Sequence, residues 1–250
     1  MRNILKQLFI LSLLLSALNV SATELQVATS EWIPYVGKEL PNQGLATDIV
    51  TRALKRAGYK PSVTIQAWNR TLEGADIGVY DLIAAAWYSK AREKSFLFSK
   101  PFIYNEIKLL KHVDSKFQFN SIADLNGHTI GVLDGYAYGE KFDGAQGISR
   151  IPGVHVLQNI TRVINREIEL TLDDERVLEY EIRHNISLNK DRLVFLSKPV
   201  SKNGLHIAVS RLNPKHKEIV AAFDKAIVAM RKDGTYDRIL ELHRESKKSQ

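Results

Sequence analysis

The chain has 250 residues, no cysteine, and 35 Lys and Arg against 28 Asp and Glu, which gives a formal net charge of +7. The lack of cysteine excludes disulfides, a cysteine nucleophile and cysteine metal ligands. The basic residues are scattered rather than gathered in a stripe, which argues against nucleic-acid binding.

The first residues predict an export signal. Arg2 and Lys6 precede an apolar run over residues 8–18, and the pattern ends in the small-x-small sequence VSA at Ala22. A membrane anchor is the alternative, but this run is short for a membrane span, and no second run of about 18 apolar residues follows it. We expect a signal peptide over residues 1–22, a location in the periplasm and a soluble mature chain.

Strands and one helix are expected in the first part of the mature chain. Residues 45–58 place Leu45, Ile49 and Leu54 on one helical face, and Gly58 ends the helix. The run DLIAAAW (81–87) is apolar throughout, as expected of a strand buried on both faces. The other strands expected here are 25–29, 61–67 and 104–112, with a Pro- and Gly-rich loop after the first.

The second part continues to alternate between strands and helices. This alternation predicts an α/β fold with mainly parallel sheets, in which the strand-like segments around 104–112 and 202–209 cross between two lobes. The expected strands are 128–133, 154–157, 170–172, 191–196 and 204–211, and the expected helices are 121–127, 161–168, 173–184, 214–234 and 235–246.

Five motifs in order suggest a family. They are EWIPY after the first strand, GLATDIVTRALKRAGY, YDLIAAAWYSKAREKSFLFSKPF, DLNGHTIGVLDG and MRKDGTYDRIL. Together these motifs make the chain resemble the bacterial extracellular solute-binding proteins of family 3, the periplasmic receptors for polar amino acids. The resemblance covers nearly the whole mature sequence.

The resemblance implies a two-lobed clamshell in which each lobe is a mainly parallel sheet flanked by helices, with two crossing strands as the hinge. Lobe 1 is expected at 23–107 and 206–250, and lobe 2 at 108–205. A small carboxylate-bearing solute, such as an amino acid or a related compound, is expected to bind between the lobes and pass to a membrane ABC permease. The resemblance implies a monomer with no cofactor and no metal.

Arg92 is the expected anion anchor. It follows the buried strand at the place where the family has an arginine that holds the ligand's α-carboxylate. A guanidinium offers a planar fork that meets a carboxylate with two parallel hydrogen bonds. The alternative is a surface arginine that pairs with Glu93 or Glu106.

Asp174 is the expected partner of a ligand amine. The segment REIELTLDD fits the family's lobe-2 pattern, which places an aspartate at the start of a helix, and Asp173 stands beside it. The alternative is a helix cap, because DDER before an apolar-periodic helix is a good capping sequence.

Aromatic residues are expected to form the walls. Trp32 and Trp68 take positions where the family often has an aromatic residue, and Trp87 lies at the strand end ahead of Arg92. A core position is the alternative for any single tryptophan. Arg70 is a second cation that is expected to enter the same cleft.

The sequence departs from the family at the ligand's expected contacts. Ala84, Ala85 and Trp87 replace hydroxyl-bearing residues before the arginine, and Tyr136 and Tyr138 stand where lobe 2 usually has small donors. More aromatic surface and fewer hydroxyls favour a flatter, larger or aromatic ligand, or a cation stacked on rings.

Two other functions are open. One is a ligand-sensing module for a membrane receptor, which would use the same closure as a transport protein. The other is a dehydratase acting on cyclic acids, since some of these enzymes resemble the same fold. The seven histidines show no recognisable catalytic spacing, and no hydrolase, metalloprotease or phosphate-loop motif occurs. We therefore expect a binding protein and no enzyme.

Overall fold

The computed structural model describes residues 22–245. The predicted signal peptide lies outside these residues except for Ala22. Among the helices of this range, none combines the length and the apolar character that crossing a membrane requires.

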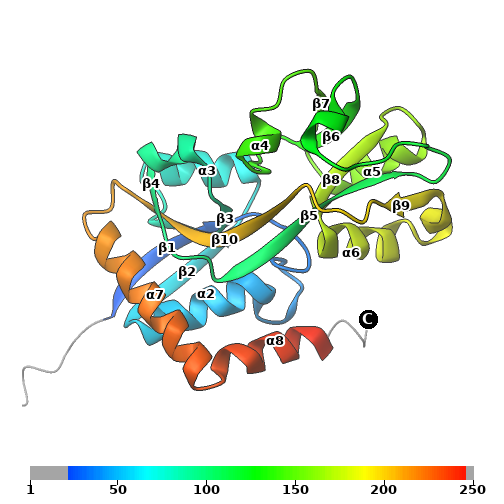
Figure 1. The fold of residues 1–250 in the computed structure, drawn as a ribbon. Coiled ribbons are helices and arrows are strands. Elements are labelled where there is room, and N and C mark those ends of the chain that lie inside the picture. The colour runs from blue at the N-terminus through cyan, green and yellow to red at the C-terminus, as the bar shows by residue number, and fades with distance from the viewer. Residues whose placement is uncertain (1–21, 246–250) are drawn as a thin grey trace, which may run out of the picture.

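The strands of the described chain join in one mixed sheet with the order β2-β1-β3-β10-β5-β8-β6-β7, while β4 pairs with β10 and β9 with β5. Figure 1 shows helices packed around both ends of this curled sheet. The strands are β1 (Thr23–Thr29), β2 (Tyr59–Ile65), β3 (Leu82–Trp87), β4 (Phe96–Phe98), β5 (Ile103–His112), β6 (Thr129–Leu133), β7 (Ser149–Gly153), β8 (Leu170–Asp174), β9 (Leu193–Phe195) and β10 (Ser201–Ser210).

Helices cover the sheet on both faces. Near the two chain ends, α2, α7 and α8 contact one another, and α3 packs against β1, β3 and β10. The α-helices are α2 (Leu45–Arg56), α3 (Trp68–Asp76), α4 (Glu140–Asp143), α5 (Val156–Ile164), α6 (Glu175–Asn185), α7 (His216–Lys232) and α8 (Thr235–Glu245). Short 3-10 helices are η2 (Pro41–Gln43), η3 (Lys90–Lys94), η4 (Ile122–Leu125) and η5 (Ser187–Arg192).

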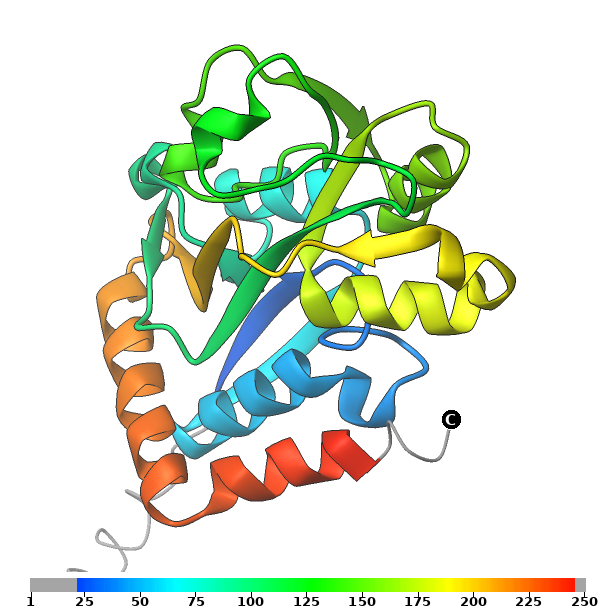
Figure 2. The ribbon, with the colours of Figure 1, turned by 45° about the vertical axis from the view of Figure 1, so that its right-hand side comes forward.

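Two long strands connect the two parts of the sheet. β5 pairs antiparallel with β10 over residues 103–107 and then with β8 over residues 107–111. β5 therefore belongs to both parts, as the turned view of Figure 2 shows. The predicted crossings lie on β5 and β10, and the predicted clamshell fold class is confirmed. The lobe boundaries at 107/108 and 205/206 stay a prediction.

The apolar run of β3 explains its central position. β3 lies between β1, to which it is parallel, and β10, to which it is antiparallel. Leu82, Ile83 and Ala84 are buried, so a polar side chain there would lose its hydration. The strand ends at Trp87, which lies opposite Leu205 of β10.

The expected elements differ from the structure around α5, where the helix expected at 161–168 lies at Val156–Ile164, and at α3. The strand expected at 154–157 is wrong, because α5 begins at Val156, where Val156, Ile160 and Val163 recur at helical spacing and are buried. The strand here is β7 instead, an edge strand whose Pro152 weakens its sequence signal. Helix α3 was not predicted, since Ala67 supplies no side-chain cap and Gly74 lies within the helix.

The loop after β1 depends on Gly44. The backbone NH of Ala46 donates to the carbonyl oxygen of Tyr35 at 2.8 Å, which holds the loop against the start of α2. Gly44 has φ +97° and ψ 165°, a region that residues with a Cβ atom rarely adopt. A Cβ atom there would lie 2.5 Å from the carbonyl oxygen of Tyr35. This loop carries Trp32 and Tyr35, so Gly44 also sets the position of two aromatic rings.

We expect Gly44→Ala to lower the free energy of unfolding by about 1–3 kcal/mol more than Gly58→Ala. Gly58 also has a positive φ of 88°, but a Cβ atom there would meet no other atom within 4 Å. The difference therefore reports the close approach of Gly44 to the backbone of Tyr35 and Val36 together with the strain of its backbone conformation. Urea denaturation of both variants measures it, and equal losses would contradict this account of the loop.

Candidate functional site

A cavity opens between the ends of β1 and β3 and the turn that follows β6. Its empty space is about 370 Å³ when the part open to solvent is counted. The carboxyl ends of parallel strands are the usual ligand-binding edge of α/β sheets. The residues that line the cavity include Trp32, Trp68, Trp87, Arg92, Tyr136 and Leu205, and no Asp or Glu.

Arg92 spans this cavity. It lies on η3, and its guanidinium donates to the carbonyl oxygens of Trp87 at 3.1 Å and Gly135 at 2.5 Å. The same group lies over the ring of Trp68, 5.2 Å from its centroid. Partial burial lowers the pKa of Arg92, although arginine stays protonated in proteins. Within residues 22–245 it forms no ion pair with a carboxylate.

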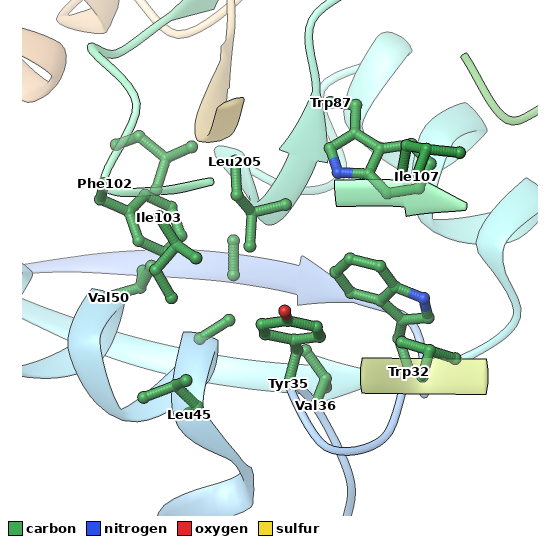
Figure 3. Close-up of a cluster of buried hydrophobic side chains, with 14 of the residues drawn as sticks. Trp32, Tyr35, Val36, Leu45, Val50, Trp87, Phe102, Ile103, Ile107 and Leu205 are labelled. Carbon is green, nitrogen blue, oxygen red and sulfur yellow. The ribbon is translucent and has the colours of Figure 1, made fainter. Parts of the chain in front are cut away.

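The three predicted tryptophans line this one cavity together. The rings of Trp32 and Trp87 meet edge to face with centroids 5.3 Å apart, and Tyr136 contacts Trp87 at 5.6 Å and Trp68 at 5.8 Å in the same manner. Trp32 also stacks on Tyr35 at 4.5 Å. Figure 3 shows Trp32, Tyr35 and Trp87 beside the aliphatic core. Their contact with a ligand stays a prediction.

Tyr138 lies behind the aromatic rings that line the cavity. It is buried, and its hydroxyl oxygen accepts a hydrogen bond from the backbone NH of Leu133 at 2.8 Å. Its ring lies 5.7 Å from Trp87 and 5.9 Å from Tyr136. Burial raises the pKa of Tyr138, so the hydroxyl stays neutral. Tyr138 therefore supports the rings that line the cavity, while Tyr136 itself lines it.

Asp174 caps α6. One of its carboxylate oxygens accepts from the backbone NH groups of Arg176 at 3.0 Å and Val177 at 3.3 Å, and the other accepts from the side-chain amide of Asn105 at 3.0 Å. Burial raises the pKa of Asp174, which these hydrogen bonds oppose. Both oxygens thus have partners inside the protein. Its contact with a ligand amine stays a prediction, and the capping alternative describes its position in the structure.

Asp173 is completely buried. Its Oδ1 accepts from the indole NH of Trp32 at 3.2 Å and from the backbone NH of Asp174 at 2.7 Å, while its Oδ2 has no hydrogen-bond partner. Burial raises the pKa of Asp173 to about 8, and the negative charges of Asp174 and Glu181 add to this effect. At neutral pH the side chain is therefore mainly protonated.

Asn105 is a site residue that the sequence analysis did not identify. It is buried in β5 and links two elements of the site, since its side chain accepts from the indole NH of Trp87 at 2.9 Å and donates to Asp174. In the sequence, Asn105 stands out only because it lies between Ile103 and Ile107, on the face of the strand that is otherwise apolar.

Arg70 lies outside the cavity and is exposed. Its neighbours at the start of α3 make the contacts instead. The indole NH of Trp68 donates to the carbonyl oxygen of Gly135 at 3.1 Å, and the amide of Asn69 donates to Asp134 at 3.1 Å. The structure therefore provides no support for Arg70 as a ligand contact, which stays a prediction.

The sequence matches the family model of bacterial extracellular solute-binding proteins, family 3, over residues 25–244. The chain belongs to this family. No metal-binding group of three or more His, Cys, Asp or Glu side chains occurs among the residues that the structure describes.

Solved structures with the same fold include binding and sensing proteins. A mutant of ArgBP from T. maritima has 18% identity and a TM-score of 0.73, covering 89% of this chain and 95% of that one. The amino acid ABC transporter substrate-binding protein AbpA from Streptococcus pneumoniae, bound to L-arginine, has 18% identity, a TM-score of 0.70 and coverage of 88% and 94%. A histidine kinase sensor domain has 16% identity, a TM-score of 0.75 and coverage of 88% and 95%. No curated protein matches the chain in sequence.

We expect Asp173→Asn to flatten the pH dependence of stability between pH 5 and 8. Because the folded-state pKa is raised to about 8 from 3.8, the folded protein holds a proton that the unfolded chain releases. The resulting stability is complete below about pH 4 and is lost as the pH rises towards 8, by at most about 1.4 kcal/mol per pH unit.

Urea denaturation at several pH values measures this slope in the wild type and in the variant. The matched control is Asp191→Asn, which changes an exposed carboxylate and should keep the wild-type slope. An unchanged slope in Asp173→Asn would show that Asp173 is charged in the folded protein.

Proposed function

We propose that the protein is a periplasmic solute-binding protein that captures a small carboxylate-bearing solute between its two lobes and delivers it to a membrane ABC transporter. The single observation that carries this proposal is the partly buried guanidinium of Arg92, which lines the cavity and has no carboxylate partner among residues 22–245. A cation removed from water without a counter-ion is costly, so an anionic ligand is the natural complement.

The guanidinium retains the means to bind such an anion. It carries five N–H donors, and two hydrogen bonds to main-chain oxygens leave others available. Its contact with the ring of Trp68 fixes the plane of the guanidinium group. A ligand carboxylate in the cavity would meet an oriented charge in a partly dry site, where ion pairing is stronger than in water.

Capture between lobes is supported by contacts across the cavity. Trp68, Asn69 and Arg92, all before residue 107, donate to the turn at Asp134 and Gly135. These bonds join the two sides of the cavity. A ligand that touches both sides would favour this arrangement through its higher affinity for it.

Delivery to a transporter is proposed from the family and from AbpA, whose name gives that role. The second candidate is a ligand-sensing module for a membrane receptor, which the similarity to a histidine kinase sensor domain favours. A strain that lacks the protein distinguishes them. Loss of solute uptake supports transport, and intact uptake with a lost transcriptional response supports sensing. We propose a monomer and no catalytic step.

We expect Arg92→Ala to weaken ligand binding by about 2–5 kcal/mol, the range for removing one side of a buried charge pair. Arg92→Lys keeps the charge but loses the planar fork and should also bind clearly less well. The probe is the compound that raises the melting temperature most in a panel of amino acids and organic carboxylates, since a ligand of the folded state stabilises it. Calorimetry then gives the affinities.

Lys94→Ala is the matched control, because Lys94 is an exposed cation on the same short helix. It should bind like the wild type. Binding by Arg92→Ala within about threefold of the wild type would remove Arg92 from the site. A ligand-free Arg92→Ala protein that no longer folds would make the arginine structural.

We expect the exported protein to begin at Thr23, after cleavage behind Ala22. The charged start, the apolar run and the VSA sequence support this site. Mass spectrometry of the intact protein from a periplasmic fraction measures the mature terminus. Protein that retains Met1 in that fraction would contradict the expectation.

A further inference from the structure

The charged lining of the cavity is of one sign, which is positive. Arg92 lines it, and no carboxylate does. Asp143 is the acid whose charge acts on Arg92, and its oxygens accept from the backbone NH groups of Tyr138 at 3.1 Å and Gly139 at 3.0 Å. The cavity thus offers a site for one negative charge and no partner for a positive one.

The two acids closest to the expected amine position do not supply that partner. Asp174 has both oxygens in hydrogen bonds to the protein. Asp173 accepts the indole NH of Trp32 through Oδ1, and its unpaired Oδ2 is buried and does not line the cavity. The raised pKa of Asp173, about 8, also leaves this side chain mainly uncharged at neutral pH. An α-ammonium group would therefore lose its hydration without gaining an ion pair.

The aromatic rings do not replace a carboxylate. A ring face can bind a cation, but Arg92 already occupies the face of Trp68 at 5.2 Å. Trp87 also meets Trp32 and Tyr136 edge to face, and each such contact takes up one ring face. An ammonium group in the same cavity would also be repelled by the guanidinium.

The rest of the lining favours an apolar body. Ala85, Ala86 and Leu205 add aliphatic surface beside the aromatic rings, and Thr29 and Ser30 add two hydroxyl-bearing side chains. We propose that the solute of this cavity is a carboxylate that has no α-ammonium group and carries a flat aromatic or branched aliphatic body. This inference rests on the proposed function and names the class of its solute.

Matched compounds test the inference on the unmodified mature protein. Three sets share a skeleton and differ in their charged groups: 3-phenylpropanoate, L-phenylalanine and phenethylamine; indole-3-propanoate, L-tryptophan and tryptamine; 4-methylpentanoate, L-leucine and 3-methylbutylamine. Calorimetry at pH 7 with each compound at up to about 1 mM gives the affinities. We expect at least one carboxylate without an amino group to bind about tenfold or more tighter than its amino acid, and the amine not to bind.

The other possible results count against the inference, or against both the inference and the proposed function. Tighter binding of the amino acid in every set that binds, or affinities within about tenfold of each other, overturns the inference and leaves the carboxylate-binding function intact. Binding of the amine as tight as that of the carboxylate overturns both, because Arg92 would then anchor no anion. Absence of binding by all nine compounds overturns the inference, while the proposed function is decided by the wider panel of amino acids and organic carboxylates.

Discussion

The site depends on one partly buried cation without a carboxylate partner among the described residues. Arg92 is held from three sides, by the carbonyl oxygens of Trp87 and Gly135 and by the ring of Trp68. These partners come from the end of β3, the turn after β6 and the start of α3, so one side chain requires all three segments to be in place. Main-chain carbonyl oxygens carry only partial negative charge. They orient the guanidinium without neutralising it, which keeps it available for a ligand anion.

A buried series of hydrogen bonds fixes the rings of Trp87 and Trp32. The indole NH of Trp87 donates to Asn105, whose amide donates to Asp174, the cap of α6. The indole NH of Trp32 donates a hydrogen bond to the neighbouring Asp173. Buried polar groups of this kind are costly unless they are paired, so each bond also fixes a ring in one orientation. The rings of Trp87 and Trp32 are thereby tied to the start of α6.

The sequence predicted those parts of the fold and the site that depend on local patterns. The apolar run of β3, the periodic faces of α2 and α7 and the position of Arg92 after a buried strand were all visible in the chain. The segment at 154–157 was misassigned because a short apolar stretch suits a strand or a helix. Asn105 was not identified because its partners, Trp87 and Asp174, lie 18 and 69 residues away, and no periodicity encodes such a contact.

The side chains that line the cavity act together. Ala85 and Ala86 of β3 bring no hydroxyl group to the cavity, and Tyr136 brings a large ring to the turn after β6. Among the described residues, the guanidinium of Arg92 is the one charged group of the cavity lining, Thr29 and Ser30 add hydroxyl groups, and most of the remaining lining is aromatic or aliphatic. Hydrophobic contact then has to supply most of the affinity for the rest of the solute, and it does so in proportion to the apolar area that leaves water. A polar or zwitterionic solute gains little from such walls, whereas one with a single charge and a flat body matches both features.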